Sequence, residues 1–182
     1  MHKDLEEILF TEREVADRIR KMGREIAAYY KAQGVEKIIV VGVLKGAFIF
    51  MADLVRKVPL DTALDFVQVS SYGSGTVSNG KPVLKKDLSL DIKGSHVLIV
   101  EDIIDTGTTL TALKGILKER GPASIAICTL IDKPSRRKVE LKPDFCGFEV
   151  PDKFIVGYGL DYNDRYRYLP YVGVLSANIY AK

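Results

Sequence analysis

Apolar residues near the start of the chain recur at helical spacing. Thr11 and Glu14 have the spacing of a capping box, in which each side chain satisfies a free backbone N–H of the other residue. Apolar positions then follow three or four residues apart over 15–29, and Gly34 is a suitable stop. We therefore predict that the chain opens with an amphipathic helix.

Beyond this helix, β-branched runs alternate with further helical periodicity. Strands are predicted over 37–43, 63–70, 83–88, 96–101, 124–131, 145–150, 154–160 and 171–175, and helices over 47–57 and 110–120. Continuous apolar runs separated by helices favour strands buried on both faces of a parallel sheet. We expect an α/β fold with a mostly parallel central sheet flanked by helices.

The length of 182 residues fits a single domain over 1–182. The core is expected at about 35–140. A small hood subdomain is expected from the N-terminal helix together with the segment after about 140, which is richer in short strands and turns.

Composition and charge exclude several classes of protein. The net charge of +3 is too small to indicate a nucleic-acid partner. The most apolar stretch, 38–55, is interrupted by Lys45 and Gly46, so no membrane span is expected. Cys128 and Cys146 lack metal-site or disulfide-framework spacing. With no secretory signal at the start, these features favour a cytoplasmic protein.

The segment 100–110 has the clearest chemistry. A buried apolar run ends in Glu101 and Asp102, and Asp105 opens a short loop before the next helix. That loop has donor groups and close-approach geometry suited to a phosphate at a helix N-terminus, and its residues are Thr106, Gly107, Thr108 and Thr109. Threonine and aspartate also cap helices without any ligand, so the loop alone would be weak evidence.

The whole pattern resembles the signature that binds 5-phosphoribosyl 1-diphosphate (PRPP) in type I phosphoribosyltransferases. Further segments resemble the hypoxanthine–guanine branch of that family: 43–46, 70–81, 132–138, 143–145 and 151–163. The resemblance covers about 37–175. Neither GxxxxGK[ST] nor a dinucleotide-binding GxGxxG occurs in the required setting.

The resemblance implies a set of residues for PRPP. Lys45, Gly46 and Arg167 would contact the diphosphate, and Thr106 to Thr109 would hold the 5-phosphate. Glu101 and Asp102 would bind the ribose hydroxyls. Together with Asp161 they would serve Mg²⁺, the implied cofactor.

The resemblance also assigns residues to the base and to the reaction. Asp105 would act as general base or acid at purine N7, and Ser71 and Tyr72 would close over the reacting sugar as a flexible loop. Lys133 would donate to the 6-oxygen of the purine. Phe154 would stack on its ring and the backbone of Ile155 would bind its edge. A solvated basic turn accounts for Arg136 and Lys138.

The expected reaction joins hypoxanthine or guanine to PRPP, giving IMP or GMP and diphosphate through an oxocarbenium-like transition state. The expected partners are these small molecules, with a homodimer or homotetramer implied by resemblance alone. Two alternatives stay open: a xanthine-preferring transferase, and a non-catalytic PRPP-sensing regulator of the same fold. Asp105 and Lys133 favour catalysis.

Overall fold

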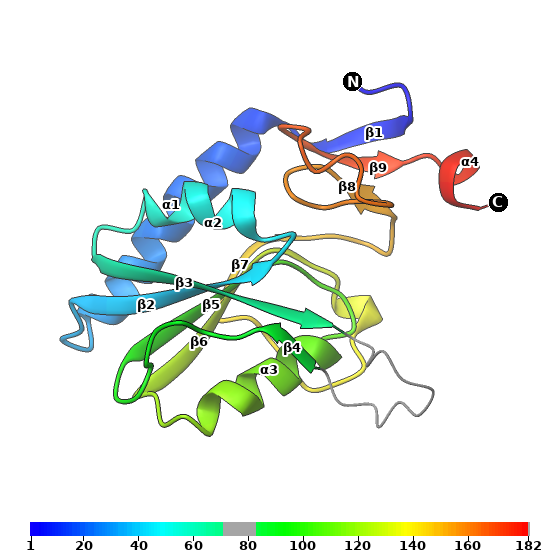
Figure 1. The fold of residues 1–182 in the computed structure, drawn as a ribbon. Helices are drawn as coiled ribbons and strands as arrows, with labels where there is room; N and C mark the ends of the chain where they lie inside the picture. The colour runs from blue at the N-terminus through cyan, green and yellow to red at the C-terminus, as the bar shows by residue number, and fades with distance from the viewer. Residues whose placement is uncertain (71–82, 182) are drawn as a thin grey trace.

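A six-stranded sheet forms the centre of the molecule. The computed structural model describes residues 1–70 and 83–181. The strand order is β4-β3-β2-β5-β6-β7, and only β4 runs antiparallel to its neighbour (Figure 1). The strands are β2 (Lys37–Leu44), β3 (Asp61–Ser70), β4 (Val83–Lys86), β5 (His96–Ile104), β6 (Ser124–Asp132) and β7 (Phe145–Glu149). The predicted α/β class with a mostly parallel sheet is confirmed.

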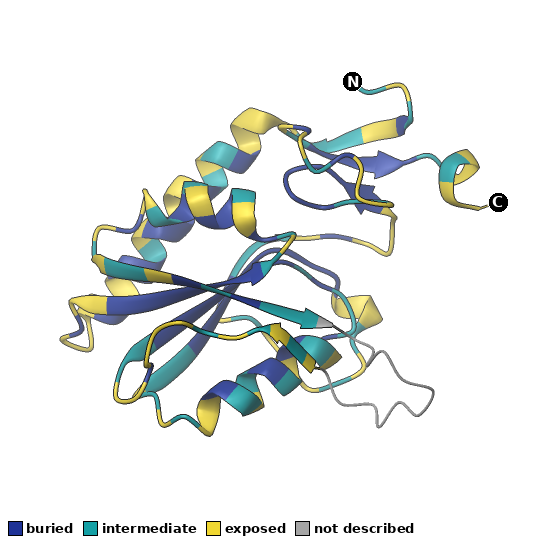
Figure 2. Ribbon diagram, viewed as in Figure 1, coloured by how far each residue is buried: buried dark blue, intermediate teal, exposed yellow. Residues whose placement is uncertain are grey.

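Helices cover both faces of this sheet. The helices α1 (Glu12–Lys31) and α2 (Phe48–Val55) lie on one face, and α3 (Thr108–Lys118) lies on the other (Figure 1). The buried strand segments are dark blue in Figure 2 and run through the middle of these layers. Both faces of β2 and β5 are therefore removed from water, which explains their continuous apolar runs.

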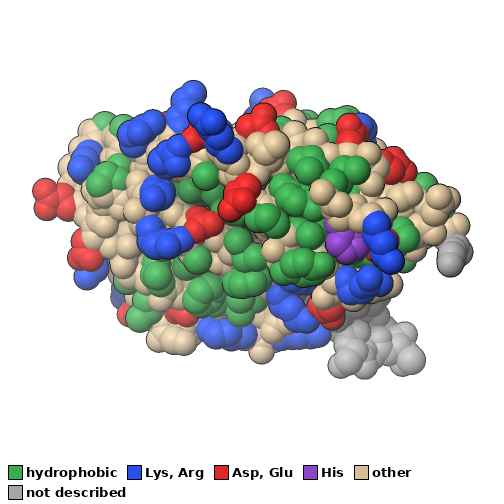
Figure 3. Space-filling model, turned by 90° about the horizontal axis from the view of Figure 1, so that it is seen from above, with side chains coloured by type: hydrophobic (Ala, Val, Ile, Leu, Met, Phe, Trp, Pro, Cys, Tyr) green, Lys and Arg blue, Asp and Glu red, His purple; other side chains and the backbone are tan. Residues whose placement is uncertain are grey.

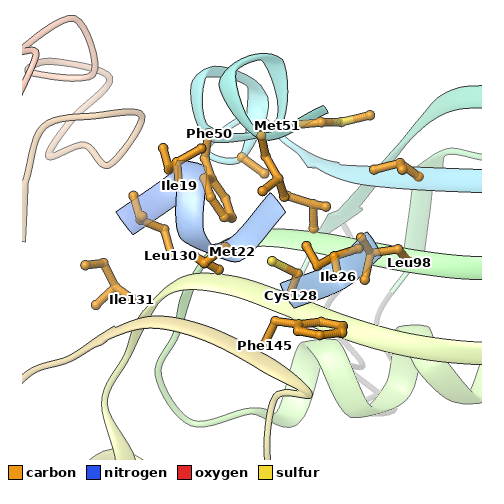
Figure 4. Close-up of a cluster of buried hydrophobic side chains, with 14 of the residues drawn as sticks. Ile19, Met22, Ile26, Phe50, Met51, Leu98, Cys128, Leu130, Ile131 and Phe145 are labelled. Atoms are coloured by element: carbon orange, nitrogen blue, oxygen red, sulfur yellow. The ribbon is translucent and has the colours of Figure 1, made fainter. Parts of the chain in front are cut away.

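The core on the α1 and α2 face joins segments far apart in the sequence. Figure 4 shows side chains from both helices meeting side chains of the sheet, among them Ile19, Met22, Ile26, Phe50, Met51, Leu98, Cys128, Leu130, Ile131 and Phe145. All of these are buried. The predicted capping box at Thr11 and Glu14 is present at the start of α1. The apolar stripe of α1 ends on the fully buried Tyr30, while the predicted Tyr29 is 42% exposed.

A small second sheet forms a hood above the carboxyl ends of the main strands. It joins the two ends of the chain, with β9 (Val172–Leu175) between β1 (Leu5–Phe10) and β8 (Ile155–Val156), all antiparallel. A short helix, α4 (Ala177–Tyr180), follows β9. β1 was not among the predicted strands, since its sequence LEEILF does not alternate between apolar and polar residues.

The predicted make-up of the hood was wrong in two respects. The N-terminal helix α1 packs on the main sheet beside α2, because its apolar stripe is wide enough to cover the sheet. β7, which lies after residue 140, pairs with β6 in the main sheet. The hood consists instead of β1 and the segment from about 153 onward.

No helix in the part of the chain that the structure describes is both long and apolar enough to cross a membrane.

Candidate active site

The site begins where β5 ends. This strand continues to Ile104, three residues past the prediction, and α3 starts at Thr108, so the loop proper is only 105–107. Gly107 caps α3 with φ of 79°, a conformation that costs glycine little. A hollow of about 130 Å³ opens there, lined by Glu101, Ile103, Ile104, Asp105, Thr106, Gly107, Thr109 and Leu110. The hollow does not include Thr108, which lies at the first turn of α3.

Two neighbouring acids lie beneath this loop. Burial and the adjacent charge of Asp102 raise the pKa of Glu101 well above its usual value. Burial also raises the pKa of Asp102. The carboxylate of Asp102 lies against the Cα of Gly46, and a Cβ there would come within 1.6 Å of Asp102 Oδ2. Gly46 is therefore needed for the close approach of the 44–46 turn to β5.

Lys45, the neighbour of Gly46 in this turn, contacts the hood. Its Nζ donates to Asp164 Oδ1 at 2.8 Å, and the peptide bond between Leu44 and Lys45 is cis. Arg167 Nη2 lies 2.7 Å from Asp161 Oδ1 and 3.5 Å from Asp164 Oδ1. The Lys45 ammonium lowers the pKa of Asp164. Two cations and two acids thus meet where the hood contacts the turn.

A larger cavity of about 470 Å³ adjoins the hollow and shares Ile103 and Asp105 with it. Its wall from the main sheet includes Asp102, Asp105, Lys133 and Arg136, and its wall from the hood side includes Asp152, Lys153, Phe154, Ile155, Leu160, Asp161 and Tyr180. The cavity is therefore bounded by strand-end loops on one side and by the hood on the other.

Lys133 is one of the few buried charged residues, with 7% of its surface exposed. Its Nζ donates to the carbonyl oxygen of Lys153 and lies 3.7 Å from Asp152 Oδ1. A buried ammonium with donor capacity left over can bind an acceptor atom in the cavity.

The hood supplies aromatic surface to the same cavity. Phe154 is 37% exposed, its ring stacks on Tyr180 with centroids 4.7 Å apart, and its edge meets Tyr162. The following residue, Ile155, is buried and pairs with β9, which fixes its backbone at the cavity wall.

Most of the residues predicted for the site lie around these two openings. Lys45, Gly46 and Arg167 meet at the hood contact, while Asp105, Lys133, Phe154, Ile155 and Asp161 line the larger cavity. Ser71 and Tyr72 lie outside the described residues.

Sequence reasoning missed several polar, glycine and aromatic residues at the site. They are Arg136, Asp152, Gly159, Asp164 and Tyr180. Arg136 was interpreted as part of a solvated basic turn, but its Nε lies 3.0 Å from Asp105 Oδ1. The several basic residues over 133–138 were the available signal in the sequence. Asp164 and Tyr180 gave none, since an acid in a turn and a tyrosine near a chain end are ordinary.

The described residues contain no cluster of three or more His, Cys, Asp or Glu side chains that could hold a metal ion by themselves. The carboxylates of Glu101, Asp102 and Asp161 nevertheless provide oxygen donors of the kind that Mg²⁺ prefers. Because desolvation raises the pKa of both Glu101 and Asp102, a cation or hydroxyl donors beside them would stabilise their charged forms.

Comparisons with known proteins agree with this geometry. The family model described as a phosphoribosyl transferase domain matches residues 7–163. The hypoxanthine phosphoribosyltransferase of Haemophilus influenzae is 50% identical over 173 residues, which are 95% of this chain and 97% of that protein. The bifunctional protein TilS/HprT of Listeria monocytogenes is 47% identical over 182 residues, and the chain covers 28% of that longer protein.

Among solved structures, a hypoxanthine phosphoribosyltransferase from Staphylococcus aureus superposes with a TM-score of 0.93 at 41% identity, covering 100% of this chain and 97% of that one. A likeness in sequence and fold over nearly the full length of the Haemophilus and Staphylococcus proteins defines the family. The chain belongs to the hypoxanthine phosphoribosyltransferase branch of the phosphoribosyltransferases, enzymes of purine salvage.

Proposed function

We propose that the chain transfers the phosphoribosyl group of PRPP to N9 of hypoxanthine or guanine and releases diphosphate. The observation that carries this proposal is the pair of adjoining openings that share Asp105. The smaller one, at a helix N-terminus, suits a phosphate, and the larger one suits a planar base. Asp105 would therefore lie between the sugar and the base.

The protein's own residues would act mainly by positioning and electrostatics. The 105–109 loop would hold the 5-phosphate as an anchor, so that the sugar carbon C1 lies beside the base. Lys45 and Arg167 would exchange their present partners for diphosphate oxygens and favour its departure. The bond from C1 to the diphosphate oxygen breaks, the bond from C1 to N9 forms, and Asp105 takes the proton released by the base.

Lys133 and Phe154 would select the base. An ammonium donates but cannot accept, so Lys133 suits the 6-oxygen of hypoxanthine and guanine and not the 6-amino group of adenine. Phe154 is partly exposed at the cavity wall and would offer aromatic surface for stacking a purine.

Mg²⁺ prefers carboxylate oxygens, which Glu101, Asp102 and Asp161 provide. We propose that these three residues help to bind Mg²⁺ and that Glu101 and Asp102 also bind the ribose hydroxyls. When bound, Mg²⁺ would neutralise diphosphate charge and improve the leaving group. Because the described residues hold no complete ligand cluster, substrate oxygens and water would supply the remaining ligands.

Two further features concern the setting of the enzyme. We expect a homodimer or homotetramer. Exposed Phe48 and Tyr168, at 46% and 71%, line a groove of about 470 Å³ together with Arg167. Figure 3 shows apolar side chains gathered across one face of the molecule.

The free thiols of Cys128 and Cys146 fit the reducing cytoplasm.

The test is the Asp105→Asn variant, which keeps the size of the side chain but removes its capacity to take a proton. We expect kcat to fall by about 10²-fold to 10⁴-fold while the affinity for PRPP is largely retained. The assay compares hypoxanthine, guanine, xanthine and adenine, with and without Mg²⁺. Near-normal turnover of Asp105→Asn would refute the role of Asp105. A preference for xanthine would favour the alternative specificity, and binding of PRPP without turnover of any base would favour a sensor.

A further inference from the structure

Arg136 lies between two acids at the wall of the larger cavity. Its Nε is 3.0 Å from Asp105 Oδ1, and its Nη1 is 3.4 Å from Asp152 Oδ2. The other oxygen of Asp152 lies 3.7 Å from Lys133 Nζ. Four charged side chains of alternating sign thus run around the cavity, from the acid proposed to take the proton to the lysine proposed to bind the base.

The backbone brings these groups together in a fixed arrangement. Asp105 and Lys133 each follow directly after paired residues of the parallel strands β5 and β6. The N–H of Lys133 donates to the carbonyl oxygen of Ile104, and the N–H of Lys138 donates to that of Thr106. Arg137 Nη1 donates to the carbonyl oxygen of Asp105 at 2.6 Å. The turn that carries Arg136 is therefore docked along the loop that carries Asp105.

The fold of the chain does not require the Arg136 pairs. The side chains of Arg136, Asp105 and Asp152 are 48%, 44% and 53% exposed, and such pairs contribute little stability in water. Their strength rises when a bound base and sugar expel water from the cavity, because the effective dielectric constant falls. The ion pairs would then matter during the reaction more than during folding.

We propose that Arg136, held by Asp152, is a positioning residue that fixes the carboxylate of Asp105 for its reaction with the base. By donating to Oδ1, the guanidinium fixes the carboxyl plane and leaves Oδ2 to meet the proton of the purine. The planar guanidinium suits this task because it reaches two carboxylates at once. This inference rests on the proposed role of Asp105.

The test compares Arg136→Gln with Lys138→Gln in the full-length enzyme. Lys138 is an exposed cation of the same turn that makes no side-chain ion pair among the described residues, so it controls for loss of charge. Arg136→Gln should lower kcat roughly 10-fold to 100-fold, the loss expected from misplacing a reacting group. The KM for PRPP and the melting temperature should stay near the wild-type values, and Lys138→Gln should leave all three unchanged.

Two further variants examine the way in which Arg136 acts. Arg136→Lys keeps the charge but loses the fork, so its kcat should lie between those of the wild type and Arg136→Gln. Removing Asp152 with Asp152→Asn should make the additional effect of Arg136→Gln on kcat smaller, since the two residues work as a unit.

Several results would overturn the inference. One is a wild-type kcat in Arg136→Gln, and another is a rise in the KM for PRPP with kcat unchanged, which would make Arg136 an anion-binding residue. If the effects of Arg136→Gln and Asp152→Asn on kcat were fully additive, Asp152 would have no part in holding Arg136. Asp105→Asn distinguishes failure of the positioning role of Arg136 from failure of the proposed role of Asp105. If that variant loses turnover while Arg136→Gln does not, only the positioning role fails; if Asp105→Asn keeps turnover, the proposed role of Asp105 fails first.

Discussion

The two walls of the larger cavity are built in different ways. The strand-end wall, with Asp105 and Lys133, follows directly from buried parallel strands, and Gly107 of the adjoining loop has positive φ. The hood wall over 153–167 has only two residues in a named strand. Four non-glycine residues of the segment that carries this wall adopt positive φ, although none of them lines the cavity itself, and they are Tyr158, Asn163, Asp164 and Tyr166.

The difference shows where each wall obtains its conformation. Residues with unfavourable dihedral angles persist only when the surroundings impose them. Tyr158 donates to Asp53 on α2, and Tyr166 donates to Asp4 near β1 at 2.8 Å. The strand-end wall is thus fixed by its own strands, whereas the hood wall depends on contacts with distant parts of the chain.

The largest expected effect lies in the strand-end wall. Lys133→Ala should lower kcat/KM for hypoxanthine about 100-fold, because the charged hydrogen bond that we propose to the 6-oxygen would be lost. Steady-state kinetics measure this effect, and the KM for PRPP should change little. Lys153→Ala is the matched control, because it keeps the carbonyl oxygen that accepts from Lys133. Equal losses in the two variants would place base selection in the hood wall instead.

Glycine substitutions compare the stability of the two walls directly. A Cβ on Gly159, at φ of 100°, would come within 2.2 Å of the carbonyl oxygen of Gly46, where only backbone could move. A Cβ on Gly107 would come within 2.9 Å of Arg137 Cδ, in a side chain that can shift. Gly159→Ala should lower the free energy of unfolding by about 3 kcal/mol. Gly107→Ala should lower it by about 1 kcal/mol.

Urea unfolding measures both losses. Gly115→Ala, an exposed helical position with nothing within 4 Å, is the control and should not destabilise the chain. A larger loss of stability in Gly107→Ala than in Gly159→Ala would contradict the view that the hood wall depends more on distant contacts than the strand-end wall does.

The smallest expected effect concerns Glu101, one of the two neighbouring acids beneath the strand-end wall. Because burial raises the pKa of Glu101 in the folded chain, the folded state binds its proton more tightly than the unfolded state. The stability gained from this tighter proton binding is fully present when the pH is below the pKa of Glu101 in the unfolded chain. It is lost as the pH rises through the pKa of Glu101 in the folded chain. Without ligand, Glu101→Gln should therefore melt about 2–4 °C above the wild type near pH 8.

Thermal melts at several pH values measure this difference, which should shrink toward pH 5. A difference that stays the same at every pH would mean that the charge of Glu101 does not destabilise the free enzyme. The same variant should bind PRPP more weakly, so stability and ligand binding would change in opposite directions.

The sequence predicted the strand-end wall well and the hood wall poorly. The continuous runs at β5 and β6 are local signals, and they identified Asp105 and Lys133 at strand ends. Of the predicted strand 154–160, only Ile155–Val156 is a strand, because the backbone leaves the extended conformation at Gly157 with positive φ. β1 was missed because its partner, β9, lies at the other end of the chain.

The order of helices and buried strands, and the acids and threonine-rich loop at the end of β5, were determined by the sequence itself. Such features arise from contiguous residues whose burial and capping are local. The pairing of Arg136 with Asp105, the contact of Asp164 with Lys45 and the make-up of the hood were decided only by the tertiary structure. These depend on which distant segments pack together, and no spacing along the chain encodes that choice.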